Sequence, residues 1–526
     1  MLDDSQSPGY YQTEIDESQT ATTPDTSIGV IVGEFPMGPV GERTLITSEP
    51  QFVATFGRPD FNYGYYAHSA LAFLAEGNQL YVTRVAPTAL FGGCTISFDG
   101  KFNTSASWSV GEADPTLHGF GASDLFAVYP VYPGLSGLYL RVYPDTLGTD
   151  PSYFYVDVYQ TGRGTALESH RVNLQHIQDG FSKQRNVAEY INRNSDYIQV
   201  VQNDTATVFV ANPTKSFINT LDAGGSADVL GINLTGASNG TRATNSDLIN
   251  AWDLYADPEY VSVSILINAG NTNVDYQHKL IELAEERADC FAILDVPDES
   301  KAAAKAVDWR RNTLASDTTY AGCYSPWLLA ADKYNDVRDY FPPSGFVAAR
   351  FVATDRDYAS YWAPAGKTRG KLPVDGAHVV YDKGMRDALY SSQINVVRVT
   401  NGEGIIVMGA DTLQVVQSAL SNISVRRLMI LIEQSLASVL EYSVFDPNDT
   451  ILRSRLESLA KGVLQPIQDG RGLYYYHVQC DDDNNPASAI ASGDLYIDIY
   501  VDPALPVKRI HFTAIVNRTG VTVTAQ

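Results

Sequence analysis

Cysteine is scarce in the 526-residue chain, and long apolar runs are missing. The four thiols, at positions 94, 290, 323 and 480, form no CxxC pair and match no His/Cys spacing typical of zinc. Reduced thiols in a protein that folds in a cytosol are therefore favoured over a disulfide framework. No apolar stretch approaches the roughly 20 residues that a membrane-spanning helix needs. The start of the chain also lacks the basic and apolar regions of a signal peptide.

Positive charge is in short supply. The chain has 37 lysines and arginines against 61 aspartates and glutamates, a net charge of −24. A surface of this sign repels nucleic acid, so we do not expect nucleic acid as a partner. The imbalance is uneven, because residues 365–526 carry 15 cations and 17 carboxylates and are close to neutral. The C-terminal third is therefore expected to face different surroundings from the rest.

Motifs of catalysis are missing as well. The sequence has no GxSxG, HExxH, Walker A or EF-hand pattern, and no GxGxxG after a strand. The "DDDNN" run at 481–485 lacks the glycine and distal glutamate of a calcium loop, which favours a solvated turn. We expect no catalytic, cofactor-binding or metal-binding residue. The best local argument for an enzyme is "EERADCFAILDVPDES", where acidic groups follow a buried strand.

Alternating strand and helix patterns are present in two stretches of the chain. Near the start, an apolar strand is followed by helices and a second strand, and the alternation resumes after about residue 245. This order is typical of a three-layer α/β domain with helices on both faces of a sheet. The sequence predicts that such a middle domain is discontinuous and comprises residues 23–94 and 126–364.

The remaining segments differ from that pattern. Residues 95–125 are rich in glycine and serine without helical period, which predicts a small β-rich insertion facing outward. Residues 365–526 contain helical patterns at about 411–421, 425–442 and 449–465, followed by strand-like runs. These predict a C-terminal α+β domain.

Both ends of the chain are lone alternating β segments. "SPGYYQTEID" places Tyr11, Thr13 and Ile15 on one side, and residues 517–526 alternate around Val521 and Val523. Neither segment has a hairpin partner beside it in the sequence. Each strand could pair within its own domain or with another chain, because an unpaired strand edge attracts partners.

Five cations in the C-terminal part stand out by position. Arg426 and Arg427 open one predicted helix, where the helix dipole disfavours positive charge, so each needs a carboxylate within the chain or on another subunit. In the next helix, Arg453 and Lys461 are about 80° apart at 100° per residue, and Arg455 lies at the far side of that face. This face is a candidate for contact with an acidic partner.

A series of segments, taken in order, resembles the contractile tail sheath proteins of bacteriophages and related contractile particles. No single segment is specific, but their number and order are. They are "SPGYYQTEID", "GVIVGEFPMGPV", "LITSEPQFVATFG", "LAFLAEGNQLYVTRV", "VYPGLSGLYLRVY", "YSPWLLAAD", "FPPSGFVAARFVATDRDYASYWAPAG", "SSQINVVRVTNGEGIIVMGADTL", "SVRRLMILIEQSL" and "GDLYIDIYVDPALPVKRIHF".

The resemblance implies a multidomain sheath-protein fold whose terminal strands are exchanged between subunits. Residues 1–22 would then form an arm that joins the sheet of a neighbouring subunit. The C-terminal strand would do the same, and residues 365–526 would form the inner sheath domain. The interface residues implied are Tyr10, Tyr11, Thr13, Ile15, Val521 and Val523.

The function implied is structural. Subunits would form hexameric rings stacked helically around a tail tube in an extended, metastable state, and contraction would drive the tube through the host envelope. Partners would be the tail tube, baseplate and tail terminator proteins, in a virion tail assembled in the host cytoplasm. Neither a cofactor nor membrane insertion is implied. The cationic face of Arg453, Arg455 and Lys461 would point to an acidic tube through weak, releasable contacts.

Two other functions fit parts of the same pattern. One is the sheath of a related bacteriocin or secretion-type injection device, which the motifs do not separate from a phage sheath. The other is an α/β enzyme, whose only local support is the acidic run after the strand near residue 295.

Overall fold

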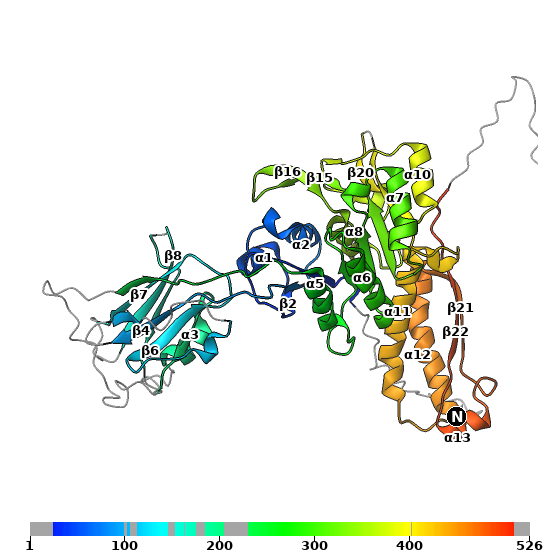
Figure 1. Ribbon diagram of the computed structural model, residues 1–526. Helices are drawn as coiled ribbons and strands as arrows, with labels where there is room; N and C mark the ends of the chain where they lie inside the picture. The colour runs from blue at the N-terminus through cyan, green and yellow to red at the C-terminus, as the bar shows by residue number, and fades with distance from the viewer. Residues whose placement is uncertain are drawn as a thin grey trace, which may run out of the picture.

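The computed structural model describes residues 25–98, 102–105, 113–145, 153–162, 164–174, 185–204, 230–400 and 402–509. Three parts lie in a row: a β-rich domain at one end, a central α/β domain, and a helical module flanked by two strands at the other end (Figure 1). Within the described ranges, no helix is long and apolar enough to cross a membrane. The predicted α/β, multidomain fold class is confirmed.

The central domain is built on a nine-stranded sheet. Its strand order is β17-β20-β19-β14-β13-β12-β1-β3-β2. The six strands from β19 to β3 run parallel. At one edge β2 pairs antiparallel with β3, and at the other β20 pairs antiparallel with both β19 and β17. The strands are β1 (Gly29–Gly33), β2 (Thr44–Ile46), β3 (Leu80–Arg84), β12 (Ile265–Ile267), β13 (Phe291–Asp295), β14 (Ala321–Ser325), β17 (Lys371–Leu372), β19 (Ile394–Thr400) and β20 (Gly404–Val407).

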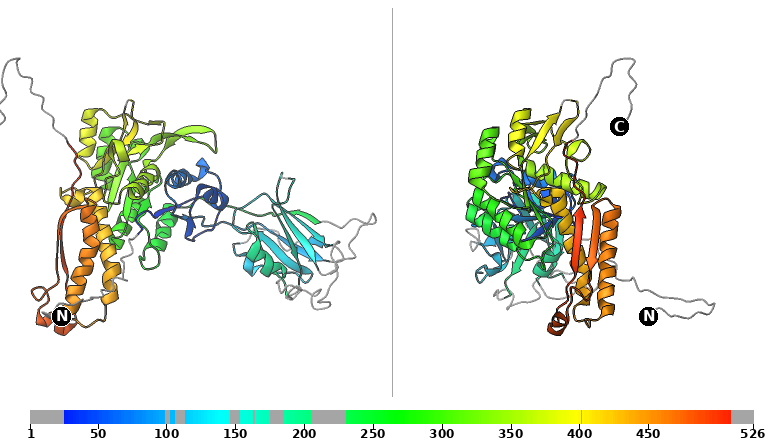
Figure 2. Two further views of the ribbon diagram at one scale, coloured as in Figure 1. Left: turned by 180° about the vertical axis from the view of Figure 1, so that it is seen from behind. Right: turned by 90° about the vertical axis from the view of Figure 1, so that its right-hand side faces the viewer.

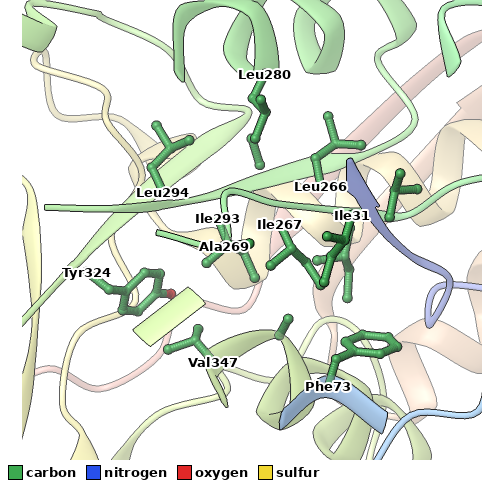
Figure 3. Packing of buried hydrophobic residues seen from close by; sticks show 14 of the residues in the cluster. Ile31, Phe73, Leu266, Ile267, Ala269, Leu280, Ile293, Leu294, Tyr324 and Val347 are labelled. Atoms are coloured by element: carbon green, nitrogen blue, oxygen red, sulfur yellow. The ribbon is translucent and has the colours of Figure 1, made fainter. Parts of the chain in front are cut away.

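Helices cover both faces of this sheet. Leu280 of α6 (Val274–Arg287) packs on one face, and Phe73 of α2 (Tyr66–Leu74) and Val347 of α8 (Pro343–Asp357) pack on the other (Figure 3). Strands β1 and β13 are consequently buried at every position. This burial explains why both strands appear in the sequence as continuous apolar runs without alternation.

Two glycines allow the layers to approach closely. A side chain at Gly33 would meet the Tyr66 ring at 2.2 Å, and one at Gly345 would meet the backbone of Ser69 at 2.6 Å. Helix α2 is therefore wedged between strand β1 and helix α8.

Shorter elements complete the central domain. A three-stranded sheet, in the order β16-β15-β18, lies beside the main one. The remaining elements are α1 (Glu49–Phe56), α5 (Asn245–Ala251), α7 (Ala303–Asp308), α9 (Gly366–Arg369), α10 (Lys383–Tyr390), β15 (Leu328–Asp332), β16 (Val337–Phe341) and β18 (Gly376–Ala377).

The β-rich domain contains two four-stranded antiparallel sheets and helix α3 (Val187–Asn194), which share a hydrophobic cluster separate from the central one. One sheet has the order β10-β6-β4-β5 and the other β11-β7-β8-β9. The strands are β4 (Cys94–Phe98), β5 (Phe102–Ser105), β6 (Asp124–Pro130), β7 (Leu138–Pro144), β8 (Phe154–Gln160), β9 (Glu168–Val172), β10 (Ile198–Gln202) and β11 (Leu230–Asn233).

This arrangement corrects the predicted domain boundaries. The expected insertion at 95–125 is too short, because the β-rich domain begins at Cys94 and its cluster extends to Leu234. The strands between 126 and 233 place their buried apolar residues in that cluster or in a small one around Ala127 and Tyr129, and none in the central one. The predicted middle domain of 126–364 therefore starts too early.

Arg84 joins the β-rich domain to the central domain. The chain leaves after β3 and returns before α5 as two adjacent segments, bridged at Leu90–Ser238 and Gly93–Thr235. The fully buried Arg84 guanidinium donates hydrogen bonds to the carbonyls of Phe35, Gly38 and Pro133 and to Oδ1 of Asn239, at 2.8–3.0 Å. Burial lowers its pKa to about 10, still well above neutral pH.

The C-terminal module follows the last strands of the central sheet. Helices α11 (Ile423–Leu440) and α12 (Thr450–Asp469) pack together, and β21 (Leu473–Gln479) pairs with β22 (Asp498–Pro503) alongside α12 (Figures 1 and 2). Helix α13 (Ala487–Ser492) lies in the connection between the strands. The predicted domain 365–526 therefore starts too early, because β17, β19 and β20 belong to the central sheet.

The helix predicted at about 411–421 is wrong. Side chains in this segment hydrogen-bond locally, with Ser418 and Ser421 both donating to Gln414 Oε1. The Asn395 side chain also holds the backbone of Asp411 from a neighbouring strand. These polar bonds compete with helix formation and stabilise a loop.

Because the two hydrophobic clusters are separate, we expect the β-rich domain to unfold independently. Phe154→Ala removes a fully buried ring that stacks on Phe126 at 5.7 Å. It should destabilise that domain by about 3–5 kcal/mol. Calorimetry should show one transition shifted and the other unchanged, and Phe73→Ala should shift the other one. A single transition that both substitutions shift equally would contradict this expectation.

Candidate assembly surface

The β21–β22 hairpin is a two-stranded sheet with one face packed and one face open. Val478 and Ile499 lie opposite each other and pack against α11 and α12. On the other face, Tyr475 and Tyr500 are exposed, and His477 stacks on Tyr500 with ring centroids 6.2 Å apart. Alternation in both strands thus produces one apolar face and one solvent-facing face rich in tyrosine.

The outer edges of this hairpin are open. In the described part of the chain, β21 pairs only with β22, and β22 only with β21. The main-chain donors and acceptors along each outer edge can therefore pair with an extended segment of another chain.

The turn between α11 and α12 exposes a second feature, an apolar tip formed by Tyr442, Val444, Phe445 and Ile451. Phe445 is fully exposed and adopts a positive φ of 76°. Clustered apolar side chains on a surface mark contact sites for other proteins. The hairpin and the tip together make this module suited to self-association.

Arg427 has its partner within the chain. Its guanidinium and the Asp355 carboxylate are both nearly buried and form a two-point contact, with Nη1 donating to Oδ1 at 2.8 Å and Nη2 to Oδ2. Nη2 also donates to the carbonyl of Thr26, and Thr26 donates to the same carboxylate. This pair connects α11, α8 and the segment that leads into β1.

Arg426 has partial compensation within the chain, although its buried Nε has no hydrogen-bond partner among the described residues. Its guanidinium lies over the Tyr320 ring at 4.2 Å from the centroid and approaches the Glu433 carboxylate at 3.6 Å. The expectation of partners for Arg426 and Arg427 is therefore met by the intramolecular alternative. Both side chains are buried in the single chain, which favours the intramolecular alternative, and a contact of either with another subunit stays a prediction.

The three cations predicted to form one face of α12 differ in exposure, because one is buried and two are half exposed. Arg453 is only 5% exposed and donates to Asp482 Oδ1 at 2.7 Å and to Asn448 Oδ1 at 3.2 Å. Its assignment as a residue facing the tube is therefore wrong, since it secures the acidic "DDDNN" turn after β21. Arg455 and Lys461 are 49% and 50% exposed, so their candidacy as contact residues stays a prediction.

The residues predicted for the terminal arms lie outside the described residues. These are Tyr10, Tyr11, Thr13 and Ile15 at one end and Val521 and Val523 at the other. The last strand-like run expected in the C-terminal part before the terminal segment, "VKRIHFTAIV" at 507–516, is described only to residue 509, and residues 507–509 have no regular structure.

Sequence reasoning missed a basic groove of about 1550 Å³, which we define by its charged lining residues. It lies between α9, α10 and β19 on one side and the segments flanking the β21–β22 hairpin on the other. The cations are contributed by separate segments, and only the near neutrality of residues 365–526 hinted at them. They are Arg369, Arg386, Arg398, Arg471, Lys508 and Arg509, and the carboxylates are Asp387 and Asp411.

The acidic strand end that supported an enzyme has a structural explanation. Asp295 is buried and accepts hydrogen bonds from Asn268 Nδ2 at 2.9 Å, Gly270 N at 2.9 Å, and the backbone N and Oγ of Ser344 at 2.7 Å. Burial raises its pKa above the usual range. It joins the start of α8 to the ends of β12 and β13.

The cysteines and the possible metal ligands lie as follows. All four cysteines are free and buried, and burial raises the pKa of Cys94 and Cys323 to about 12. No group of three or more His, Cys, Asp or Glu side chains among the described residues is placed to hold a metal ion.

Comparison with known proteins matches this chain to phage tail sheath proteins. The model of the phage tail sheath protein central domain matches residues 241–413, and that of the phage tail sheath C-terminal domain matches 415–517, together more than half of the chain. These matches confirm the resemblance drawn from the sequence motifs.

Two curated relatives agree. The tail sheath protein of Vibrio phage KVP40 is 24% identical over 98% of both chains. That of Enterobacteria phage T4 is 29% identical over 54% of this chain, and the match spans about half (46%) of that relative's length. The solved sheath complex of an extracellular contractile injection system, in its contracted state, shares the fold at a TM-score of 0.53, with 14% identity over 97% of this chain and 98% of that one.

The buried contact between Arg427 and Asp355 yields a stability prediction. Arg427→Met would leave the Asp355 carboxylate buried without its cation, which should cost about 3–5 kcal/mol in the free energy of unfolding. Arg427→Met with Asp355→Leu should recover most of that loss, because no charge remains buried. Urea unfolding followed by circular dichroism measures both, with Lys461→Met as an exposed control. Equal losses in the single and double variants would contradict the argument.

Proposed function

Since the chain belongs to the phage tail sheath family, we propose that it is the structural subunit of a contractile tail sheath. The observation that carries the proposal is the C-terminal module, with an open-edged hairpin and an exposed apolar tip inside a region matched by the sheath family. A surface of this kind serves assembly rather than catalysis. Curated relatives named as tail sheath proteins support a place in the phage tail.

Assembly would proceed by strand addition. Residues 1–22 and the C-terminal strand of one subunit would extend the β21–β22 sheet of neighbouring copies, giving main-chain hydrogen bonds at both open edges. Subunits would stack as hexameric rings around a tail tube, between a baseplate and a tail terminator, during assembly in the host cytoplasm.

Contraction would then be a change in packing between subunits. Each subunit would move largely as a rigid body into a wider and shorter helix, while the exchanged strands keep neighbours connected. The free energy stored in the extended state at assembly would drive the tube through the host envelope. The contracted sheath complex that shares this fold supports such a transition.

The β-rich domain would face away from the tube. It lies at the far end of the molecule from the C-terminal module (Figure 1) and joins the central domain through two adjacent segments. The outward-facing position predicted for residues 95–125 is thereby extended to the whole β-rich domain.

A second candidate is the sheath of a bacteriocin or secretion-type injection device. The likeness to an extracellular contractile injection system favours it, whereas the curated relatives from phages favour a virion. Mass spectrometry of purified particles decides between them, since only a virion carries capsid proteins and packaged DNA together with this chain.

Removal of residues 1–17 tests the strand exchange. The truncated chain should remain folded and monomeric, because the three large hydrophobic clusters are built from residues 30–478. It should fail to form sheaths, because the strand that would join a neighbouring sheet is gone. Negative-stain microscopy and light scattering measure assembly. A glycine–serine segment of equal length in place of residues 1–17 controls for chain length and should fail likewise. Long sheaths from either variant would contradict the proposal.

Charge reversal on α12 tests the tube contact. Arg455→Glu with Lys461→Glu should lower assembly on tubes about tenfold, because exposed ion pairs each contribute up to about 1 kcal/mol. Self-assembly without tubes should be less affected. Arg58→Glu with Arg311→Glu, at exposed sites of the central domain, makes the same change of charge as a control. Equal loss of both kinds of assembly would count against a contact with the tube.

A further inference from the structure

The basic groove carries positive charge that the described residues compensate only in part. Of its six cations, Lys508 forms an ion pair with Asp411, while the five arginines have no ion pair with any described carboxylate. Arg398 and Arg509 are exposed without a hydrogen-bond partner in the described ranges, although the chain as a whole has a net charge of −24. Cations collected in one groove repel one another, and a bound anionic group would remove that cost.

Two arginines of the groove are held in position. Arg369 donates from Nε to the carbonyl of Ala363 at 2.9 Å and lies over the Trp362 ring at 4.8 Å. Arg386 donates from Nη1 to the carbonyl of Tyr381 at 2.7 Å. Guanidinium groups oriented in this way lose little freedom when they bind a carboxylate.

The chain itself contains a segment of matching charge. Residues 1–24, outside the described part, contain five carboxylates and no lysine or arginine, whereas residues 510–526 contain one arginine and no carboxylate. The first segment complements the groove and the second does not. In an extended strand, Glu14 and Asp16 share one face about 6.6 Å apart.

We propose that the basic groove binds the acidic N-terminal segment, residues 3–17, of a neighbouring copy. The contact would be made by carboxylate–guanidinium pairs that anchor the segment beside the open-edged hairpin. The source of the segment rests on the proposed function, in which this part of the chain joins another subunit. Because the groove is open to solvent, the contact should weaken as ionic strength rises.

A charge swap tests the proposal in full-length protein. Arg398→Glu with Arg509→Glu should slow self-assembly about tenfold at low salt, and Glu14→Lys with Asp16→Lys should do the same. All four substitutions together should restore most of the rate, because the attraction returns with reversed sign. Arg58→Glu with Arg311→Glu changes the net charge equally without touching the groove and should leave the rate close to wild type.

Cysteine crosslinking identifies the source of the segment. The four native thiols are buried, so introduced cysteines react selectively. Full-length Asp16→Cys mixed with full-length Arg398→Cys should give a covalent dimer under mild oxidation, whereas Arg311→Cys in place of Arg398→Cys should not. The doubly substituted chain should give crosslinked multimers.

Three results would overturn the proposal. A crosslink confined within single chains would mean that the groove holds its own N-terminal segment. Normal self-assembly of the groove variant, with loss only on tubes, would identify an acidic tube as the occupant. If the groove variant assembles as fast as wild type in every condition, the groove is not the docking site. The proposed function would be unaffected by that result. If the wild-type chain itself does not assemble into sheaths, the proposed function fails.

Discussion

Burial of both faces of the central sheet is the constraint from which the rest of the molecule follows. Helices α2 and α8 on one side and α6 on the other leave no free face, so additions are confined to its edges and to the ends of its strands. The β-rich domain leaves after β3, and the C-terminal module follows β20. A tightly packed, two-sided core deforms little, which suits the rigid-body movement proposed for the subunit.

Two buried arginines connect this core to its additions. Arg84 binds three carbonyls and one amide oxygen where the β-rich domain departs, and Arg427 pairs with Asp355 where α11 begins. A planar guanidinium with several fixed donors specifies orientation better than apolar packing does. We infer that these contacts set the angles at which the two additions project, because each would leave a buried charge unsatisfied if the joint rotated.

The sequence predicted individual elements better than their grouping. Strands β1 and β13 and helix α6 are evident from local apolar patterns, because both faces of the sheet are covered. The β-rich domain was underestimated because its hydrophobic cluster is assembled from residues spread between Cys94 and Leu234. No local pattern reports such contacts.

The same limit applies to the charged residues. Helical spacing gave the direction of Arg453 relative to Lys461, yet it could not show that the turn after β21 covers Arg453. The helix dipole correctly required partners for Arg426 and Arg427, but Asp355 lies 72 residues away from Arg427 in the chain. The basic groove was invisible for a similar reason, since its cations come from separate elements.

The buried thiols bear on how long such a subunit endures. A particle released from its host has no enzymes to reduce oxidised cysteine, so damage to its proteins accumulates with age. Oxidation and disulfide exchange proceed through the thiolate, and burial of Cys94, Cys290, Cys323 and Cys480 both blocks access and raises the pKa of each thiol. A sheath made of these subunits would therefore resist cysteine oxidation while it remains in the extended state in air-saturated water.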